Sequence, residues 1–123
     1  MKAVIFNADD FGLNATTNKA ILLAHTEGVL TSASLMVTGD AAVEAAQIAR
    51  DIASLAVGLH LVLVDGKASL PYTMVPRLAN EFGMFESDDF KVGLRYFFSN
   101  RARWEVQQEV EAQFRQFASL GLN

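Results

Sequence analysis

The sequence predicts an α/β fold built on a βαβαβ parallel sheet. Short apolar runs rich in β-branched residues alternate with segments whose apolar residues recur at helical spacing. This alternation is typical of parallel strands joined by right-handed helical crossovers, with helices covering the sheet. At 123 residues and 51% hydrophobic composition, the chain is long enough for one domain, residues 1–123, with a hydrophobic core.

The first predicted strand and helix lie in the N-terminal quarter of the chain. Ala3 to Phe6 is a continuous apolar run, which predicts a buried parallel strand. A polar loop, NADDFGLNATT, follows and leads into a helix over Asn18 to Thr26. Gly28 stands where a C-terminal cap is expected, so the first helix is predicted to end there.

Two further strands and one helix complete the predicted sheet. Thr31 to Val37 is the second strand, and Leu55 to Val64, rich in Val and Leu, is the third. Asp40 is a candidate N-terminal cap for the intervening helix, which runs to Ile52. These elements extend the parallel sheet to three strands.

The second half of the chain departs from this alternation. Residues 65–98 contain turn-forming Gly and Pro, which predict an insertion or lid. Their aromatic residues are expected to pack as a small core rather than form a sugar-stacking surface. Helical spacing returns from Arg101 and ends at Gly121. Along this helix Val106, Val110, Phe114 and Phe117 are predicted to form an apolar stripe, with Glu105, Glu109, Glu111 and Arg115 on other faces.

Composition excludes several classes of function. A net charge of −4 offers no broad basic surface to nucleic acid or anionic lipid. Cysteine is absent, so any metal must be bound by carboxylate or imidazole groups. The N-terminal apolar run is too short for a signal peptide, and no apolar segment reaches membrane-spanning length. We therefore expect a cytoplasmic protein with no membrane span.

Two adjacent carboxylates, Asp9 and Asp10, follow the first predicted strand, and His60 lies near the end of the third. Ligands of parallel α/β folds meet the sheet at the carboxyl ends of its strands, so these three side chains can converge. A carboxylate and an imidazole can bind zinc or a similar ion, which makes water acidic enough to attack an amide carbonyl. Neighbouring carboxylates would then divide the work, one binding metal and one serving as a general base.

Structural explanations of the same residues stay open at this point. Asp9 and Asp10 could form a turn and a helix cap, and His60 could be a hydrogen-bonded core histidine. Asn7 and Asn14 could order the turn or line a polar pocket. His25 is expected to be exposed near the C-terminal end of the first helix.

In order and spacing, Ala-Asp-Asp-Phe-Gly, Thr-Ser-Ala-Ser-Leu-Met and Gly-Leu-His-Leu resemble the YdjC-like carbohydrate deacetylases. The later LP, VP, GMF and GLRYFF are similar to the HpnK branch, associated with hopanoid biosynthesis. The resemblance implies the N-terminal part of a distorted (β/α) barrel and metal-dependent removal of an N-acetyl group from an amino sugar. The substrate would be a glycolipid, such as a hopanoid glycoside, or an oligosaccharide.

By position, the resemblance implies that Asp9 is the general base and that Asp10 and His60 bind the divalent metal, zinc or magnesium. Family members continue for roughly as many residues again, consistent with a barrel of about 250 residues. The chain has no histidine after His60, so a third metal ligand is missing and the chain looks like an N-terminal half. A half barrel would expose apolar surface and a strand edge, which predicts a homo-oligomer.

Two other functions compete with the deacetylase. A receiver-like phosphoacceptor domain would use the acidic pair to hold Mg²⁺. Such a domain needs an aspartate at the end of its third strand, where this chain has His60, and a late lysine, whereas none follows Lys91. The third possibility is a non-catalytic, dimerising remnant, because two metal ligands alone should bind an ion weakly.

Overall fold

The structure, a computed structural model, describes residues 2–122 and divides them into two compact units. Unit 1 runs to His60 and also includes the C-terminal segment from Phe117. Unit 2 comprises Leu61–Gln116. The predicted active-site residues therefore all belong to unit 1, and the predicted insertion or lid belongs to unit 2.

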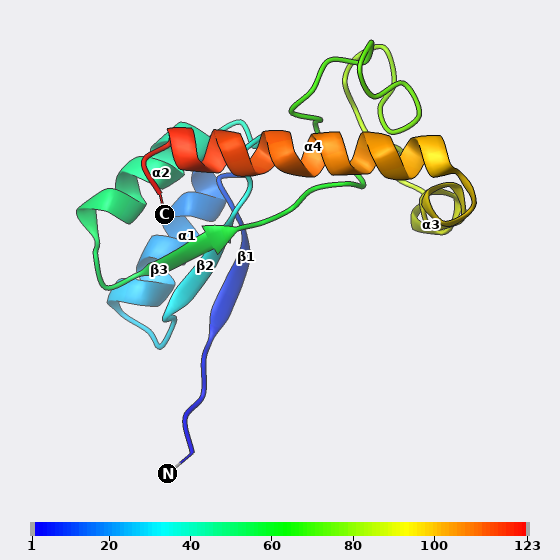
Figure 1. Cartoon of the computed structure of the whole chain (residues 1–123). Helices are drawn as coiled ribbons and strands as arrows, with labels where there is room; N and C mark the ends of the chain where they lie inside the picture. The colour runs from blue at the N-terminus through cyan, green and yellow to red at the C-terminus, as the bar shows by residue number, and fades with distance from the viewer. Residues whose placement is uncertain (1, 123) are drawn as a thin grey trace. The chain divides into compact units, whose positions relative to one another are not determined.

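Unit 1 is built on a three-stranded parallel sheet in the order β1-β2-β3 (Figure 1). The strands are β1 (Asn7–Phe11), β2 (Ser32–Leu35) and β3 (Ala56–Leu59). Helix α1 (Ala15–Thr26) joins the first two strands, and α2 (Ala42–Asp51) joins the last two. The predicted βαβαβ arrangement is confirmed.

One face of this sheet forms the core of unit 1, because alternate strand residues point toward the helices. Ala33 and Leu35 of β2 are 1% and 0% exposed, whereas Ser32 and Ser34 on the opposite face are only half-buried. The last turn of α4 adds Phe117 to the same core. The core comprises Phe11, Ile21, Ala33, Leu35, Val37, Ala45, Ala46, Leu55, Phe117 and Leu122.

The prediction of a buried first strand over Ala3 to Phe6 was wrong. Val4 and Ile5 are 70% and 79% exposed, and the hydrogen-bonded register begins with Asn7 opposite Ser32. An apolar run identifies a strand only where another strand and a packing layer cover it. Within residues 2–122, the parallel ladder with β2 starts after this run, so polar residues occupy the strand instead.

Several predicted ends of elements were also displaced. Helix α1 begins before Asn18, because the Asn14 side chain accepts a hydrogen bond from the Thr17 amide at 2.9 Å and caps the helix. Its C-cap is Glu27 rather than Gly28. The N-cap of α2 is Ala41 rather than the predicted Asp40, and Ala41 makes no side-chain cap hydrogen bond.

Unit 2 contains α3 (Asp89–Phe98), most of α4 (Asn100–Ser119) and an irregular segment before them. Two antiparallel bridges, Lys67 with Met84 and Ala79 with Phe85, order the irregular segment. Helix α3 was not predicted. It is tied to this segment by the Tyr96 hydroxyl, which donates to the Leu63 carbonyl at 2.9 Å, and burial raises the pKa of Tyr96 to about 12.

The prediction for the faces of α4 was partly wrong, although Phe117 of the predicted apolar stripe is buried. The side chains of Glu105, Glu109 and Gln113 are 0% exposed, whereas Phe114 of the predicted apolar stripe is 54% exposed. Glu109 accepts hydrogen bonds from the Ser69 and Leu70 amides at 2.7 and 3.0 Å. An irregular backbone leaves amides without ladder partners, so acidic side chains on the facing helix satisfy them.

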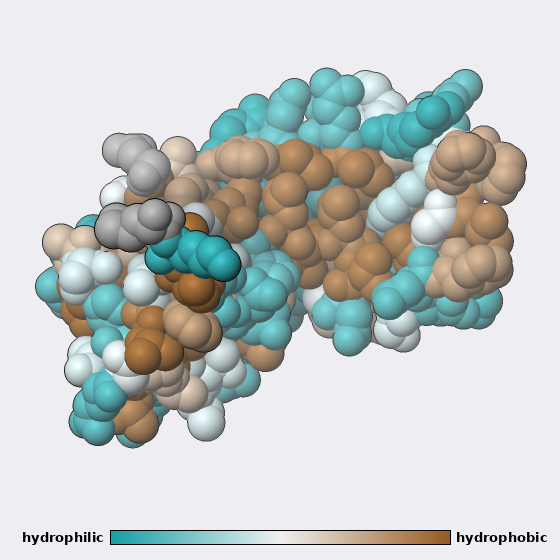
Figure 2. Space-filling view, turned by 90° about the horizontal axis from the view of Figure 1, so that it is seen from below, coloured by the Kyte–Doolittle hydropathy of each residue, from teal (hydrophilic) through white to brown (hydrophobic). Residues whose placement is uncertain are grey.

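The aromatic residues of unit 2 do not form the predicted small core. Phe85 is 5% exposed, but Phe82, Phe90 and Phe98 are each more than 70% exposed. Figure 2 shows apolar side chains, in brown, covering much of the face seen from below. No helix among residues 2–122 is long and apolar enough to cross a membrane.

Candidate active site

The sequence predicts that the acidic pair lies just past the end of the first strand. In the structure the pair lies inside β1. The register of β1 against β2 shifts between Ala8 and Phe11, so Asp9 and Asp10 form an irregularity of the bulge type. Asp10 has φ 61°, the left-handed region that residues other than glycine seldom adopt. In a regular strand neighbouring side chains point to opposite faces, whereas this irregularity redirects Asp10.

His60 follows β3 and completes the cluster. Its amide donates to the Leu35 carbonyl at 2.8 Å, which extends the pairing of β2 and β3 by one residue. The imidazole Nδ1 lies 3.9 Å from Asp9 Oδ1, and Nε2 lies 3.7 Å from Asp10 Oδ1. The structure therefore brings together all three predicted site residues. The His60 side chain is 28% exposed and faces two carboxylates, which does not fit a core histidine.

Asn7 orients Asp9. The Asn7 amide nitrogen donates to Asp9 Oδ1 and to Ser34 Oγ, each at 3.0 Å. The Ser32 hydroxyl donates to Asn7 Oδ1 at 2.8 Å, which fixes the direction of the carboxamide. The serines of the Thr-Ser-Ala-Ser motif thus act on Asp9 through Asn7, so the polar-pocket interpretation of Asn7 fits this geometry.

The turn after the acidic pair is held by a buried asparagine that sequence reasoning missed. Asn18 is 0% exposed, and its Oδ1 accepts the Gly12 amide at 2.8 Å. Its amide nitrogen donates to the Ala41 carbonyl at 3.1 Å and to Glu44 Oε2 at 2.9 Å. A polar residue inside the first helical turns, next to a glycine-containing loop, was the available signal.

Close backbone packing explains two glycines at this turn. Gly12 has φ 95°, and a Cβ there would lie 3.0 Å from the Met36 carbonyl oxygen. A Cβ on Gly39 would lie 2.2 Å from the Gly12 carbonyl oxygen, a distance that no side chain can occupy. The loops after β1 and β2 therefore contact each other directly and form a firm base beneath the acidic pair.

The other histidine has a structural role. His25 Nδ1 lies 2.7 Å from the Leu30 carbonyl oxygen, and Nε2 lies 2.8 Å from Ser54 Oγ. It is half-buried rather than exposed, so that prediction was wrong. Both ring nitrogens are already used, which leaves His60 as the histidine able to bind a ligand.

The donor set fits a divalent ion. Two ligand atoms at about 2.1 Å from a tetrahedral zinc lie roughly 3.4 Å apart. The 3.7 Å between His60 Nε2 and Asp10 Oδ1 needs only a small adjustment to reach that geometry. Within residues 2–122, no group of three or more His, Cys, Asp or Glu side chains is placed to hold an ion.

Known proteins resemble this chain over nearly its whole length. A carbohydrate deacetylase of Geobacillus stearothermophilus is 42% identical over 96% of this chain and 44% of its own length. A chitooligosaccharide deacetylase of Citrobacter koseri is 36% identical over 97% of this chain and 44% of its own length. The chain thus spans less than half the length of these relatives.

A solved structure of an Enterococcus faecalis protein, described as a cellobiose-phosphate cleavage protein, matches with a TM-score of 0.80. It is 37% identical and covers 95% of this chain and 44% of its own chain. The predicted fold class, a parallel α/β sheet that forms part of a distorted (β/α) barrel, is confirmed. The family model for YdjC-like proteins matches residues 3–123, and the chain therefore belongs to the YdjC-like protein family.

Proposed function

We propose that this chain is the metal-binding portion of a hydrolase that removes N-acetyl groups from an amino sugar. The observation that carries the proposal is the approach of His60 to both carboxylates of the acidic pair, at 3.7 and 3.9 Å. Relatives that carry the names carbohydrate deacetylase and chitooligosaccharide deacetylase support the reaction class.

Each site residue has a separate role in this proposal. Asp10 and His60 would hold the divalent ion, zinc or magnesium, and the nitrogen ligand favours zinc. When bound, such an ion polarises the amide carbonyl and makes water more acidic. Asp9, whose Oδ1 accepts the Asn7 amide at 3.0 Å, takes the proton from the attacking water and returns it to the departing amine.

The finer parts of the proposal concern substrate and assembly. The chain is an N-terminal portion within the HpnK branch, acting on a glycolipid such as a hopanoid glycoside, or on an oligosaccharide. Residues 65–98 serve as an insertion or lid within its domain. Because the described part of the chain contributes two metal ligands, we propose that the 123-residue species alone is inactive.

Homo-oligomerisation through the half-barrel surface is also proposed. Strand β1 is an edge of the sheet within the described chain, and Phe6 beside it is 51% exposed. Apolar surface and strand edges of this kind favour pairing with another chain. Light scattering should show a mass that rises with protein concentration, and a constant monomer mass would contradict this part.

The reaction can be tested in a chimera in which this chain replaces the matching segment of the Geobacillus stearothermophilus relative. Asp9→Asn keeps the size of the side chain but removes the base, so acetate release should fall on the order of 10² to 10⁴-fold. Asp88→Asn changes an aspartate in a second Asp-Asp pair and is the matched control, with activity unchanged.

Two results would change this proposal. Equal turnover of the Asp9→Asn chimera and the parent chimera would remove Asp9 from the mechanism. Acetate release by the 123-residue chain alone, abolished by a chelator, would contradict the proposed inactivity of the separate species and would also exclude the non-catalytic remnant.

A further inference from the structure

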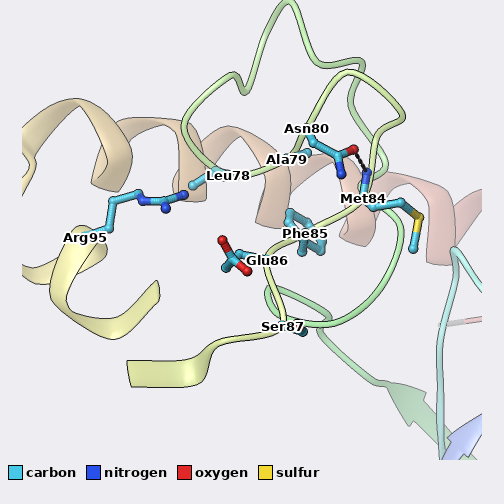
Figure 3. A pocket seen from close by; sticks show the side chains of 8 residues that line it. All are labelled: Leu78, Ala79, Asn80, Met84, Phe85, Glu86, Ser87 and Arg95. Atoms are coloured by element: carbon cyan, nitrogen blue, oxygen red, sulfur yellow. Dashed lines mark hydrogen bonds between the residues drawn. The ribbon is translucent and has the colours of Figure 1, made fainter. Parts of the chain in front are cut away.

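Unit 2 contains a polar cavity outside the candidate active site. The cavity, here called the Arg95 pocket, has a volume of about 340 Å³ (Figure 3). Buried Leu78 and Phe85, which are 2% and 5% exposed, form part of its wall. Asn80, Glu86, Ser87 and Arg95 supply its polar groups. Its size lies at the lower end of the range for small-molecule sites.

The backbone around the pocket is firmly held. Asn80 Oδ1 accepts the amides of Phe82 and Met84, each at 3.0 Å. The backbone amide of Asn80 donates to the Met84 carbonyl at 2.9 Å, and Ala79 forms an antiparallel bridge with Phe85. Because backbone donors occupy the side-chain oxygen of Asn80, the orientation of its carboxamide is fixed. The side-chain nitrogen of Asn80 is left as a donor.

The Arg95 side chain is held in place, and neither charged group of the pocket is neutralised. Arg95 Nη1 donates to the Arg77 carbonyl at 2.8 Å, which fixes the guanidinium and leaves its other N–H groups available. The Glu86 backbone is held through the Asp65 amide at 3.2 Å. Within residues 2–122, neither Arg95 nor Glu86 has an ion-pair partner. Figure 3 shows both side chains projecting into the same space.

We propose that the Arg95 pocket binds a saccharide unit, through residues that do not belong to the candidate active site. The pocket presents donors from Arg95 and Asn80, an acceptor from Glu86 and a hydroxyl from Ser87. A hydroxyl group donates and accepts at the same time, so a polyol can satisfy groups of both kinds. One sugar ring fits the volume of the cavity.

The charges argue against an ion as the ligand. An anion would pair with Arg95 but would leave Glu86 unpaired and repelled, and a cation would do the reverse. A zwitterion is the remaining competitor, and the experiment separates it from a sugar.

The test is a titration of the ¹⁵N-labelled 123-residue chain, followed by NMR, with methyl glucoside as the probe. This sugar has no acetamido group, so its binding does not depend on the proposed hydrolysis. We expect saturable shifts of the amides between Asn80 and Ser87. Glu86→Gln should weaken binding about tenfold, because a hydrogen bond to a charged acceptor is lost. Glu81→Gln, outside the pocket lining, should leave binding unchanged.

Arg95→Lys provides a second variant that keeps the positive charge while removing the planar fork. It should also weaken binding, with an amide spectrum that otherwise matches the parent chain. Absence of shifts between Asn80 and Ser87 at saturating sugar would overturn the proposal. The proposal would also be overturned if serine, a zwitterion, shifts these amides and methyl glucoside does not. Binding of methyl glucoside to Glu86→Gln with the affinity of the parent chain would overturn it as well.

Discussion

The chain contains two Asp-Asp pairs, and the structure uses them differently. Asp88 precedes α3, and its side chain accepts the Lys91 amide at 3.0 Å, so this pair begins a helix. Asp9 and Asp10 lie at an irregularity of β1 and face His60. The dipeptide alone does not decide between structure and chemistry. What separates the pairs is whether the carboxylates accept backbone amides.

The same criterion separates the buried acids of unit 2 from the acidic pair in unit 1. Glu109 accepts two backbone amides and the Gln113 side chain, and it is 0% exposed. Asp9 accepts one side-chain amide, and the Asp10 side chain is 53% exposed. Carboxylates whose lone pairs already bind amides stabilise the fold, whereas those left open remain available to a ligand.

The largest effect on stability is expected at Glu109. Glu109→Leu leaves the Ser69 and Leu70 amides without an acceptor, so the free energy of unfolding should fall by about 3 kcal/mol. Glu111→Leu, at an exposed position of the same helix, should change it by less than about 0.5 kcal/mol. Urea unfolding followed by circular dichroism measures both, and equal values would show that the hydrogen bonds of Glu109 do not stabilise unit 2.

A smaller loss is expected at Asn18, beneath the acidic pair. Asn18→Leu leaves the buried Gly12 amide without its acceptor, so stability should fall by about 2 kcal/mol. Asn14→Ala removes only the exposed cap of α1 and should cost about 1 kcal/mol. Urea unfolding measures both variants, and the midpoint of Asn18→Leu should be lower than that of Asn14→Ala. If Asn14→Ala were the more damaging change, Asn18 would not be the anchor of this turn.

The contribution of the Asp88 cap to the stability of α3 should depend on pH. The Lys91 amide and the Lys91 side chain lower the pKa of Asp88 below its ordinary value of 3.8. Because the folded-state pKa is lowered, the cap stabilises α3 above pH 3.8 and is lost as pH falls through the folded value. Asp88→Ala should reduce helicity at neutral pH, and its difference from the parent should vanish in acid.

Asp89→Ala is the control for this cap. It changes the adjacent carboxylate, whereas the carboxylate that accepts the Lys91 amide belongs to Asp88. A difference from the parent that persists at low pH would attribute the Asp88 effect to something other than its charge.

The smallest effect on stability is expected from the acidic pair in unit 1. Asp9→Asn and Asp10→Asn should each change the free energy of unfolding by less than about 0.5 kcal/mol, as is usual for exposed positions. Asparagine also tolerates the φ of 61° at residue 10. Thermal unfolding checks this, and a large loss would assign the pair a structural role.

Much of unit 1 was predictable, because its elements carry local signals. The apolar run around Ala33 and Leu35 and the helical spacing of α2 identify a strand and a helix from sequence alone. The start of β1 was not predictable, because the ladder is set by pairing with Ser32 rather than by hydrophobicity. The convergence of Asp9, Asp10 and His60 followed from parallel topology, but the bulge that turns Asp10 did not.

Unit 2 was poorly predicted for a physical reason. Its irregular segment satisfies its amides through Glu105 and Glu109, so polar residues occupy the buried face of α4. Hydrophobic periodicity assumes that buried faces are apolar, and it therefore selected Val106, Val110 and Phe114. Helix α3 begins at the Asp88 cap, and from sequence alone an aspartate that caps a helix cannot be distinguished from one in a turn.

The most direct test of the central claim is a zinc titration by calorimetry on the 123-residue chain. His60→Ala and His25→Ala are the matched pair of variants, since the chain has two histidines. The account predicts weak but measurable zinc binding that His60→Ala abolishes and His25→Ala retains. Zinc binding that survives His60→Ala, or is lost only in His25→Ala, would contradict the assignment of Asp10 and His60 as metal ligands.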